Sequence, residues 1–165
     1  MAQTAGAPPA PPPPGCESPG SRRFDFWIGE WDVFAKADLT KKIAESVIEN
    51  RYHGCAIREN WQPKTDGGGS LSAYAPADRQ WRQTWVDSCG AWVDFRGGWD
   101  GKAMVLEGVW PQPGHPSQIT RMTYTAWPDG SVEQRGDTSD DARKTWRAGF
   151  DFVYRRKAVS PAGGG

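Results

Sequence analysis

Short runs in which hydrophobic and polar residues alternate fill the middle of the chain, and turn-forming residues separate them. The runs are rich in Trp, Tyr, Val, Ile and Thr and recur roughly every 8–12 residues, which is typical of a β-sandwich or a β-barrel. Asp100-Gly101 and Asp129-Gly130 are dipeptides that favour tight hairpins, because both turn positions tolerate positive φ. The pattern therefore predicts an all-β fold made of consecutive hairpins.

We expect about ten strands, with a short helical turn at 21–28 before the first of them. The short connections favour an antiparallel up-and-down barrel over a sandwich, which usually needs long Greek-key connections. Closure into a barrel also removes exposed sheet edges. The expected strands lie at residues 30–37, 44–53, 55–63, 69–76, 80–87, 91–98, 102–110, 118–127, 131–138 and 147–157.

Segments rich in proline and glycine flank this region. We predict a disordered leader at 1–20, one barrel domain at 21–158 and a disordered tail at 159–165, because such segments favour extended conformations and cannot bury a core. The N-terminus as given has no apolar signal-peptide core. We expect a periplasmic or secreted protein if a signal peptide has been removed ahead of it, and a cytoplasmic protein otherwise.

Charge and composition narrow the possible partners. Lys and Arg together number 20, as do Asp and Glu, and the nearest approach to a basic patch is Arg155-Arg156-Lys157 on the expected last strand. This argues against nucleic-acid binding, which needs a basic surface. No apolar run reaches the roughly 18 residues of a transmembrane helix. Ten Trp residues suit a cavity that contains polar groups, because each buried indole N–H needs a hydrogen-bond acceptor.

Cys16, Cys55 and Cys89 allow three single disulfides or none. We favour Cys16–Cys55, which would attach the N-terminal arm to the barrel. The alternative is three free thiols in a reducing cytoplasm.

Residues 24–31 (FDFWIGEW) place a Gly-x-Trp at the entry to the first strand. This resembles the signature of the calycin superfamily, which includes lipocalins, fatty-acid-binding proteins and nitrobindin-like barrels. The resemblance implies that Trp31 closes one end of the barrel and that an arginine of the last strand packs over it. The alternation of Phe150, Phe152 and Tyr154 points to Arg156 for this structural role.

A longer set of matches covers most of residues 22–157 in order. Together these matches resemble a family of bacterial proteins with a DUF1579-type, lipocalin-like domain, whose members often follow a secretion signal. This resemblance implies the barrel fold and no particular activity. The matching segments are residues 24–31, Gly54-Cys55 with Glu59 and Trp61, Ser70 to Tyr74, and Gln83-Thr84-Trp85-Val86-Asp87.

Strand alternation indicates which side chains face the barrel interior. If the aromatic faces point inward, Glu59 and Gln83 point inward with them. An interior carboxylate must pair with a cation or take up a proton, and Arg121 is a candidate partner for Glu59. The predicted ligand-binding residues are Glu59, Trp61, Tyr74, Gln83, Trp85 and Arg121. The aromatic set Trp61, Tyr74, Trp81, Trp85, Trp110 and Trp127 would partly line a cavity and partly form the core.

Three functional hypotheses follow. The first is a barrel that binds a small, largely apolar or aromatic molecule and fixes its polar end. The second is a cofactor-independent isomerase or cyclase that uses either Glu59 or Asp87, together with Tyr74, for proton transfer. The third is a structural domain whose interior is filled by a hydrogen-bonded network. The sequence does not identify the ligand or the oligomeric state.

Metal and haem sites find little support. His53 and His115 are both expected at the surface, and the last strand lacks the late histidine that a nitrobindin-like haem barrel would have. The acidic run at 137–141 has neither the glycine nor the final glutamate of an EF-hand loop, so it is interpreted as a solvated turn. Ser72 and Ser88 have no histidine at a convincing partner position for a catalytic triad. We expect no cofactor and no metal.

Overall fold

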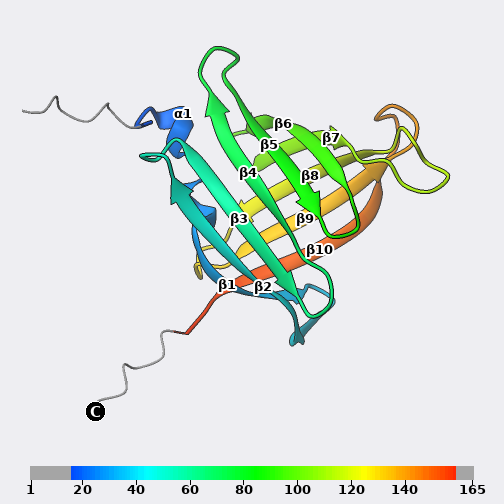
Figure 1. Cartoon of the computed structure of the whole chain (residues 1–165), viewed down its shortest axis with the longest axis horizontal. Coiled ribbons are helices and arrows are strands. Elements are labelled where there is room, and N and C mark those ends of the chain that lie inside the picture. The colour runs from blue at the N-terminus through cyan, green and yellow to red at the C-terminus, as the bar shows by residue number, and fades with distance from the viewer. Residues whose placement is uncertain (1–15, 159–165) are drawn as a thin grey trace, which may run out of the picture.

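The computed structural model describes residues 16–158, and within this range ten antiparallel strands form one closed barrel (Figure 1). Consecutive strands are hydrogen-bonded neighbours, and the first strand pairs with the last. The strands are β1 (Gly29–Ala35), β2 (Asp38–Arg51), β3 (Ala56–Pro63), β4 (Gly68–Ala75), β5 (Gln80–Asp87), β6 (Trp92–Trp99), β7 (Met104–Val109), β8 (Ile119–Ala126), β9 (Val132–Ser139) and β10 (Arg147–Arg156). The predicted all-β, up-and-down barrel is confirmed, and a barrel of this kind fits a lipocalin-like fold.

The largest difference from the predicted strands lies at the start of β2, which begins six residues before the expected residue 44. Residues 38–42 are all exposed, so they show no alternation that a sequence pattern could reveal. They continue the ladder because their backbone pairs with the end of β1, where Phe34 lies opposite Lys42. The Lys42 ammonium also contacts Asp32 and Glu45 on the outer surface.

The helical turn expected at 21–28 consists of two short pieces, α1 (Pro19–Arg22) and a 3₁₀ turn at Asp25–Trp27. The Ser18 side chain caps α1 by accepting a hydrogen bond from the Ser21 N–H. The folded unit therefore begins before residue 21, because residues 16–20 predicted as leader include Cys16 and the start of α1. Residues 1–15 of the predicted leader and 159–165 of the predicted tail lie outside the described residues.

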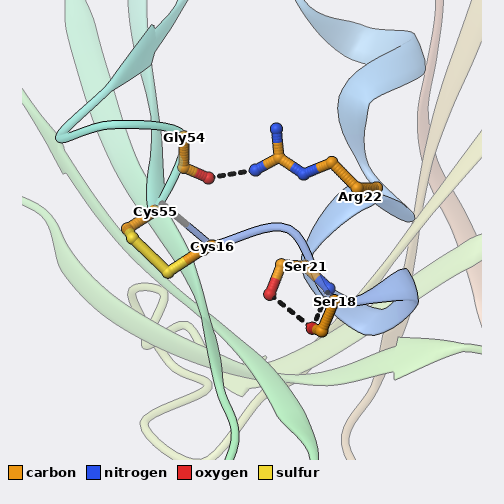
Figure 2. The surroundings of a disulfide bond; sticks show 6 residues. All are labelled: Cys16, Ser18, Ser21, Arg22, Gly54 and Cys55. Carbon is orange, nitrogen blue, oxygen red and sulfur yellow. Dashed lines mark hydrogen bonds between the residues drawn. A yellow bond between two sulfur atoms is a disulfide. The ribbon is translucent and has the colours of Figure 1, made fainter. Parts of the chain in front are cut away.

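A disulfide joins Cys16 to Cys55, as the sequence favoured (Figure 2). Cys89 is a free, exposed thiol. The Arg22 guanidinium donates a hydrogen bond to the Gly54 carbonyl beside the disulfide. The segment ahead of β1 is thus attached to the β2–β3 turn by one covalent bond and one hydrogen bond.

This attached segment closes one end of the barrel. Phe24 and Trp27 are fully buried and stack with a ring separation of 4.9 Å. The Trp81 indole N–H donates to the Gly20 carbonyl at 3.1 Å, which fixes α1 over the same end (Figure 1). We call residues 16–28 the N-terminal plug. Within residues 16–158, no helix is long and apolar enough to cross a membrane.

The predicted partnership of Trp31 and Arg156 is confirmed. Trp31 is fully buried, and the Arg156 guanidinium lies 4.4 Å from the centre of its ring. Arg156 also donates a hydrogen bond to the Ile28 carbonyl at 3.3 Å. Gly29 has a φ of +152°, and a Cβ there would lie 2.5 Å from the arginine nitrogen. The Gly-x-Trp pattern therefore combines a ring that closes the barrel with the space its arginine needs.

Candidate functional site

A cavity of about 240 Å³ lies inside the barrel, on the side away from the N-terminal plug. Its innermost lining residues are buried, whereas the aromatic rings nearer the other end are only partly buried. A ligand would therefore enter past these rings. The lining residues are Glu59, Trp61, Gln83, Trp85, Trp110, Met122, Tyr124, Gln134, Phe150, Phe152 and Tyr154.

Two groups of aromatic side chains form the walls of the cavity. On one side, Trp61 of β3 stacks on Phe152 of β10 at 5.6 Å, and Phe150 stacks on Phe152 at 4.8 Å. On the other side, Trp85 of β5 and Trp110, just after β7, lie with their rings 6.4 Å apart. The Trp85 indole N–H donates to the Asp87 carboxylate at 3.1 Å, which holds that ring in place.

The inner part of the cavity is a polar floor of buried side chains that bond to one another. Tyr154 donates to Gln134 Oε1 at 2.6 Å, and Gln134 Nε2 donates to the Tyr124 oxygen at 3.2 Å. Tyr124 donates to Gln83 Oε1 at 3.4 Å, and Gln83 Nε2 donates to Ser72 Oγ at 3.0 Å. Each group thus donates to the next, and the chain of hydrogen bonds runs in one direction.

Glu59 lies at the beginning of this chain. Its Oε2 is 3.0 Å from Ser70 Oγ, and its Oε1 is 3.3 Å from Ser46 Oγ. Its Oε1 also lies 3.4 Å from the Tyr154 hydroxyl, whose single proton is engaged in the shorter bond to Gln134. The Glu59–Tyr154 contact becomes a hydrogen bond when the Glu59 carboxyl group is protonated and its O–H donates to the Tyr154 oxygen. The geometry therefore fits a protonated Glu59 when the cavity is empty.

Electrostatics favour the same state. Burial raises the pKa of Glu59 to about 7, and the hydrogen-bonding contacts with Ser70, Ser46 and Tyr154 offset only part of that effect. No lysine, arginine or histidine of the described chain lines the cavity, so Glu59 has no cationic partner there. Burial and the nearby Glu59 carboxyl also raise the pKa values of Tyr124 and Tyr154, so both remain neutral phenols.

Folding stability should consequently fall as pH rises through neutrality. The folded state holds the Glu59 proton up to about pH 7, whereas the unfolded chain loses it near the ordinary pKa of 4.5. The stabilisation from this proton is complete below the unfolded pKa and is lost above the folded pKa, for a total of about 3 kcal/mol. Urea unfolding of the wild type and Glu59→Gln at about pH 5 and pH 8.5 measures it. Between about pH 5 and pH 8.5, we expect the free energy of unfolding of the wild type to fall by about 2–3 kcal/mol relative to that of Glu59→Gln. An identical difference at both pH values would contradict this result.

Four of the six predicted ligand-binding residues, Glu59, Trp61, Gln83 and Trp85, line the cavity together. Tyr74 does not: it packs against Gly20 and Trp81 beside the N-terminal plug. Of the remaining predicted aromatic set, Trp110 lines the cavity, Trp81 belongs to the core and Trp127 is exposed.

The predicted placement of Arg121 in the interior is wrong, and so is its pairing with Glu59. Thr120, Met122 and Tyr124 face inward on β8, so Arg121 points outward. There it donates to Glu107 at 2.7 Å, and its guanidinium lies 3.7 Å from the Trp146 ring centre.

The three predicted catalytic candidates are not brought together. Asp87 lies opposite Gly68 in the β4–β5 ladder, whereas Tyr74 lies opposite Trp81, six residues further along β4. At about 3.3 Å per residue this separates them by roughly 20 Å along the strand. Burial would raise the pKa of Asp87, but hydrogen bonds from the Ala91 N–H, the Trp85 indole and the Cys89 N–H outweigh it and lower that pKa. Glu59 is thus the one candidate in the polar floor.

Sequence reasoning missed much of the polar floor and one wall. Tyr124, Gln134 and Tyr154 complete the floor, and Phe150 and Phe152 complete the wall. The alternation of Phe150, Phe152 and Tyr154 was visible in the sequence and could have placed all three in the interior. Gln134 gave no such signal, because Val132 and Glu133 are buried as well and burial therefore does not alternate in this part of β9.

The predicted surface positions of the two histidines are confirmed, since His53 and His115 are exposed. Asp140 and Asp141, in the acidic run, bond to neighbouring side chains. Among residues 16–158, no group of three or more His, Cys, Asp or Glu side chains is arranged to hold a metal ion.

No protein-family model matches the sequence, and no curated protein is significantly similar to it. The fold and the cavity geometry are therefore the basis for interpreting function.

Proposed function

We propose that this protein binds a small aromatic or apolar molecule inside the barrel. The observation that carries the proposal is one cavity with aromatic walls, a polar floor and partly exposed rings on the side away from the plug. Ligand sites in proteins typically combine an apolar lining with a few placed polar groups, and β-barrel interiors are a common location for them. The aromatic walls would hold the body of the ligand, and the floor would fix its polar end.

Cavity size limits the ligand to one or two rings. A volume of about 240 Å³ lies below the range of roughly 300–1,000 Å³ that drug-sized ligands occupy. It exceeds the cavity of about 150 Å³ that binds benzene in an engineered protein. The proposed ligand is thus larger than a single unsubstituted ring and smaller than a typical lipid or drug.

An alternative function is proton-transfer catalysis on a molecule bound in the same cavity. One observation favours it: Glu59 is buried, has a pKa raised to about 7 and faces the space a substrate would occupy. A general acid is most effective when its pKa lies near the working pH. The two functions differ in the fate of the bound molecule, which a binding protein returns unchanged and an isomerase or cyclase converts.

The disulfide supports an oxidising location, because such bonds are rare in reducing compartments. We therefore propose a periplasmic or secreted protein. The proposed relationship to the DUF1579-type, lipocalin-like family agrees with this location, since members of that family often follow a secretion signal.

Native mass spectrometry of the undenatured protein tests the binding proposal. We expect the purified protein to carry an added mass that corresponds to a molecule of one or two rings and that disappears on denaturation. If the protein is purified without a ligand, we expect a complex to form when 2-phenylethanol is added as a one-ring probe. Trp110→Ala removes a wall ring and should weaken probe binding at least about tenfold. Trp92→Ala is the matched control, because Trp92 is 69% exposed outside the cavity, and it should leave binding unchanged. Equal weakening by both substitutions, or no complex at all, would argue against the site.

A further inference from the structure

Within residues 16–158, the buried carboxyl group of Glu59 has no positively charged partner. Its neighbours are Ser46 from β2, Ser70 from β4 and Tyr154 from β10, and the Tyr124 phenol lies across the polar floor on β8. The amides of Gln83 and Gln134 complete that floor. A buried carboxylate is normally paired with a cation, so this site can accept a positive charge that the described chain does not supply.

The walls beside Glu59 also suit a cation. Trp61 lies two residues after Glu59 on the same face of β3, so its ring is next to the carboxyl group on the way to the open side. The centre of the Trp61 ring lies 5.6 Å from that of Phe152 and 6.2 Å from that of Tyr154. Faces of aromatic rings attract organic cations, and desolvated aromatic cages are the usual site for substituted ammonium groups.

We propose that the ligand is a small aromatic amine, bound as a cation with its ammonium group between Glu59 and Trp61. This inference rests on the proposed function and names the ligand's chemical class.

The structure indicates which proton is released when the amine binds. When an ammonium ion enters the cavity, Glu59 releases its proton to solvent, and the ammonium–carboxylate pair that forms is neutral overall. The carboxylate keeps the Ser46 and Ser70 hydroxyls as donors, while Tyr154 continues to donate to Gln134. The polar floor therefore accommodates both protonation states of Glu59 without losing its chain of hydrogen bonds.

Three one-ring probes of matched size separate the charge from the ring: 2-phenylethylamine, 2-phenylethanol and propylbenzene. Alkylammonium groups stay protonated well above neutral pH. Because only ionised Glu59 pairs with the cation, we expect the amine to bind about 30-fold more tightly at about pH 8 than at pH 5.5. Binding of the alcohol and of propylbenzene should change less than about twofold over this range.

Calorimetry of the wild type provides a second readout that needs no variant. At about pH 6, amine binding should release close to one proton, measured in two buffers of different ionisation enthalpy, and release should be nearly absent at pH 9. The alcohol should release none at either pH. Glu59→Gln should remove the proton release and the preference for the amine. Glu30→Gln makes the same change on an exposed residue and should retain both.

The outcomes separate the two proposals. If the alcohol and propylbenzene bind but the amine binds no more tightly and releases no proton, the amine inference is overturned and cavity binding stands. If none of the three binds at millimolar concentration, cavity binding itself is overturned. A proton release that persists in Glu59→Gln would assign the titration to another group and would also overturn the inference.

Discussion

Replacing Cys16 and Cys55 together by serine is expected to lower the free energy of unfolding by about 4 kcal/mol. The two residues are 39 positions apart, and a cross-link over a loop of this length restricts the unfolded chain by about that amount in the chain-entropy model. The native state should lose order locally as well, because Arg22–Gly54 would be the remaining bond between α1 and the β2–β3 turn. The N-terminal plug should therefore show faster amide exchange than the strands.

Urea unfolding of the double variant against the wild type measures this effect. Cys89→Ser is the matched control, since Cys89 is exposed and unpaired, and it should change stability by less than about 0.5 kcal/mol. Reduction of the wild type should reproduce the double variant. A loss below about 1 kcal/mol would show that the native contacts of the plug hold it without the disulfide.

Trp31→Ala should destabilise the barrel by about 3–5 kcal/mol, the range for removing a large buried aromatic side chain. The Trp31 ring is fully buried, packs edge-on to Tyr154, and donates its N–H to the Trp27 carbonyl at 3.0 Å. Its loss would leave a void under the plug and remove the ring on which the Arg156 guanidinium rests. Three kinds of interaction at the closed end would therefore be lost together.

Thermal and urea unfolding of Trp31→Ala give the size of this loss. The same substitution at Trp92, which is mostly exposed, should stay within about 0.5 kcal/mol of the wild type. Normal unfolding of Trp31→Ala would mean that the Gly-x-Trp pattern does not mark the residue that closes the barrel.

The fold could be predicted because its information is local. Tight turns punctuate the chain, and within residues 16–158 each strand from β2 to β10 pairs with its predecessor, so short connections between alternating runs indicate the topology. The start of β2 was not predicted, because this part of the strand has no local signal in the sequence. Residues 38–42 are exposed on the surface, and their pairing depends on β1 rather than on any pattern of their own.

The candidate site could be predicted where polar residues share a face with aromatic ones. Glu59 and Gln83 were found in this way, because Trp61 and Trp85 fix the inward face of their strands. Arg121 was misplaced because β8 carries threonines on both faces, so alternation there does not distinguish inside from outside. The direction of the hydrogen-bond chain depends on which phenols and amides meet across the barrel, and no single strand contains that information.

Closure of the barrel gives the last strand a particular place in the synthesis of the protein. The pairing of β1 with β10 joins the two ends of the domain, whereas the other neighbouring strands can pair as they leave the ribosome. Until β10 emerges, β1 and β9 present unpaired edges of the kind that promotes aggregation. Phe150 and Phe152 of the cavity wall belong to β10 as well. A nascent chain therefore completes this cavity in the same step that removes its exposed edges.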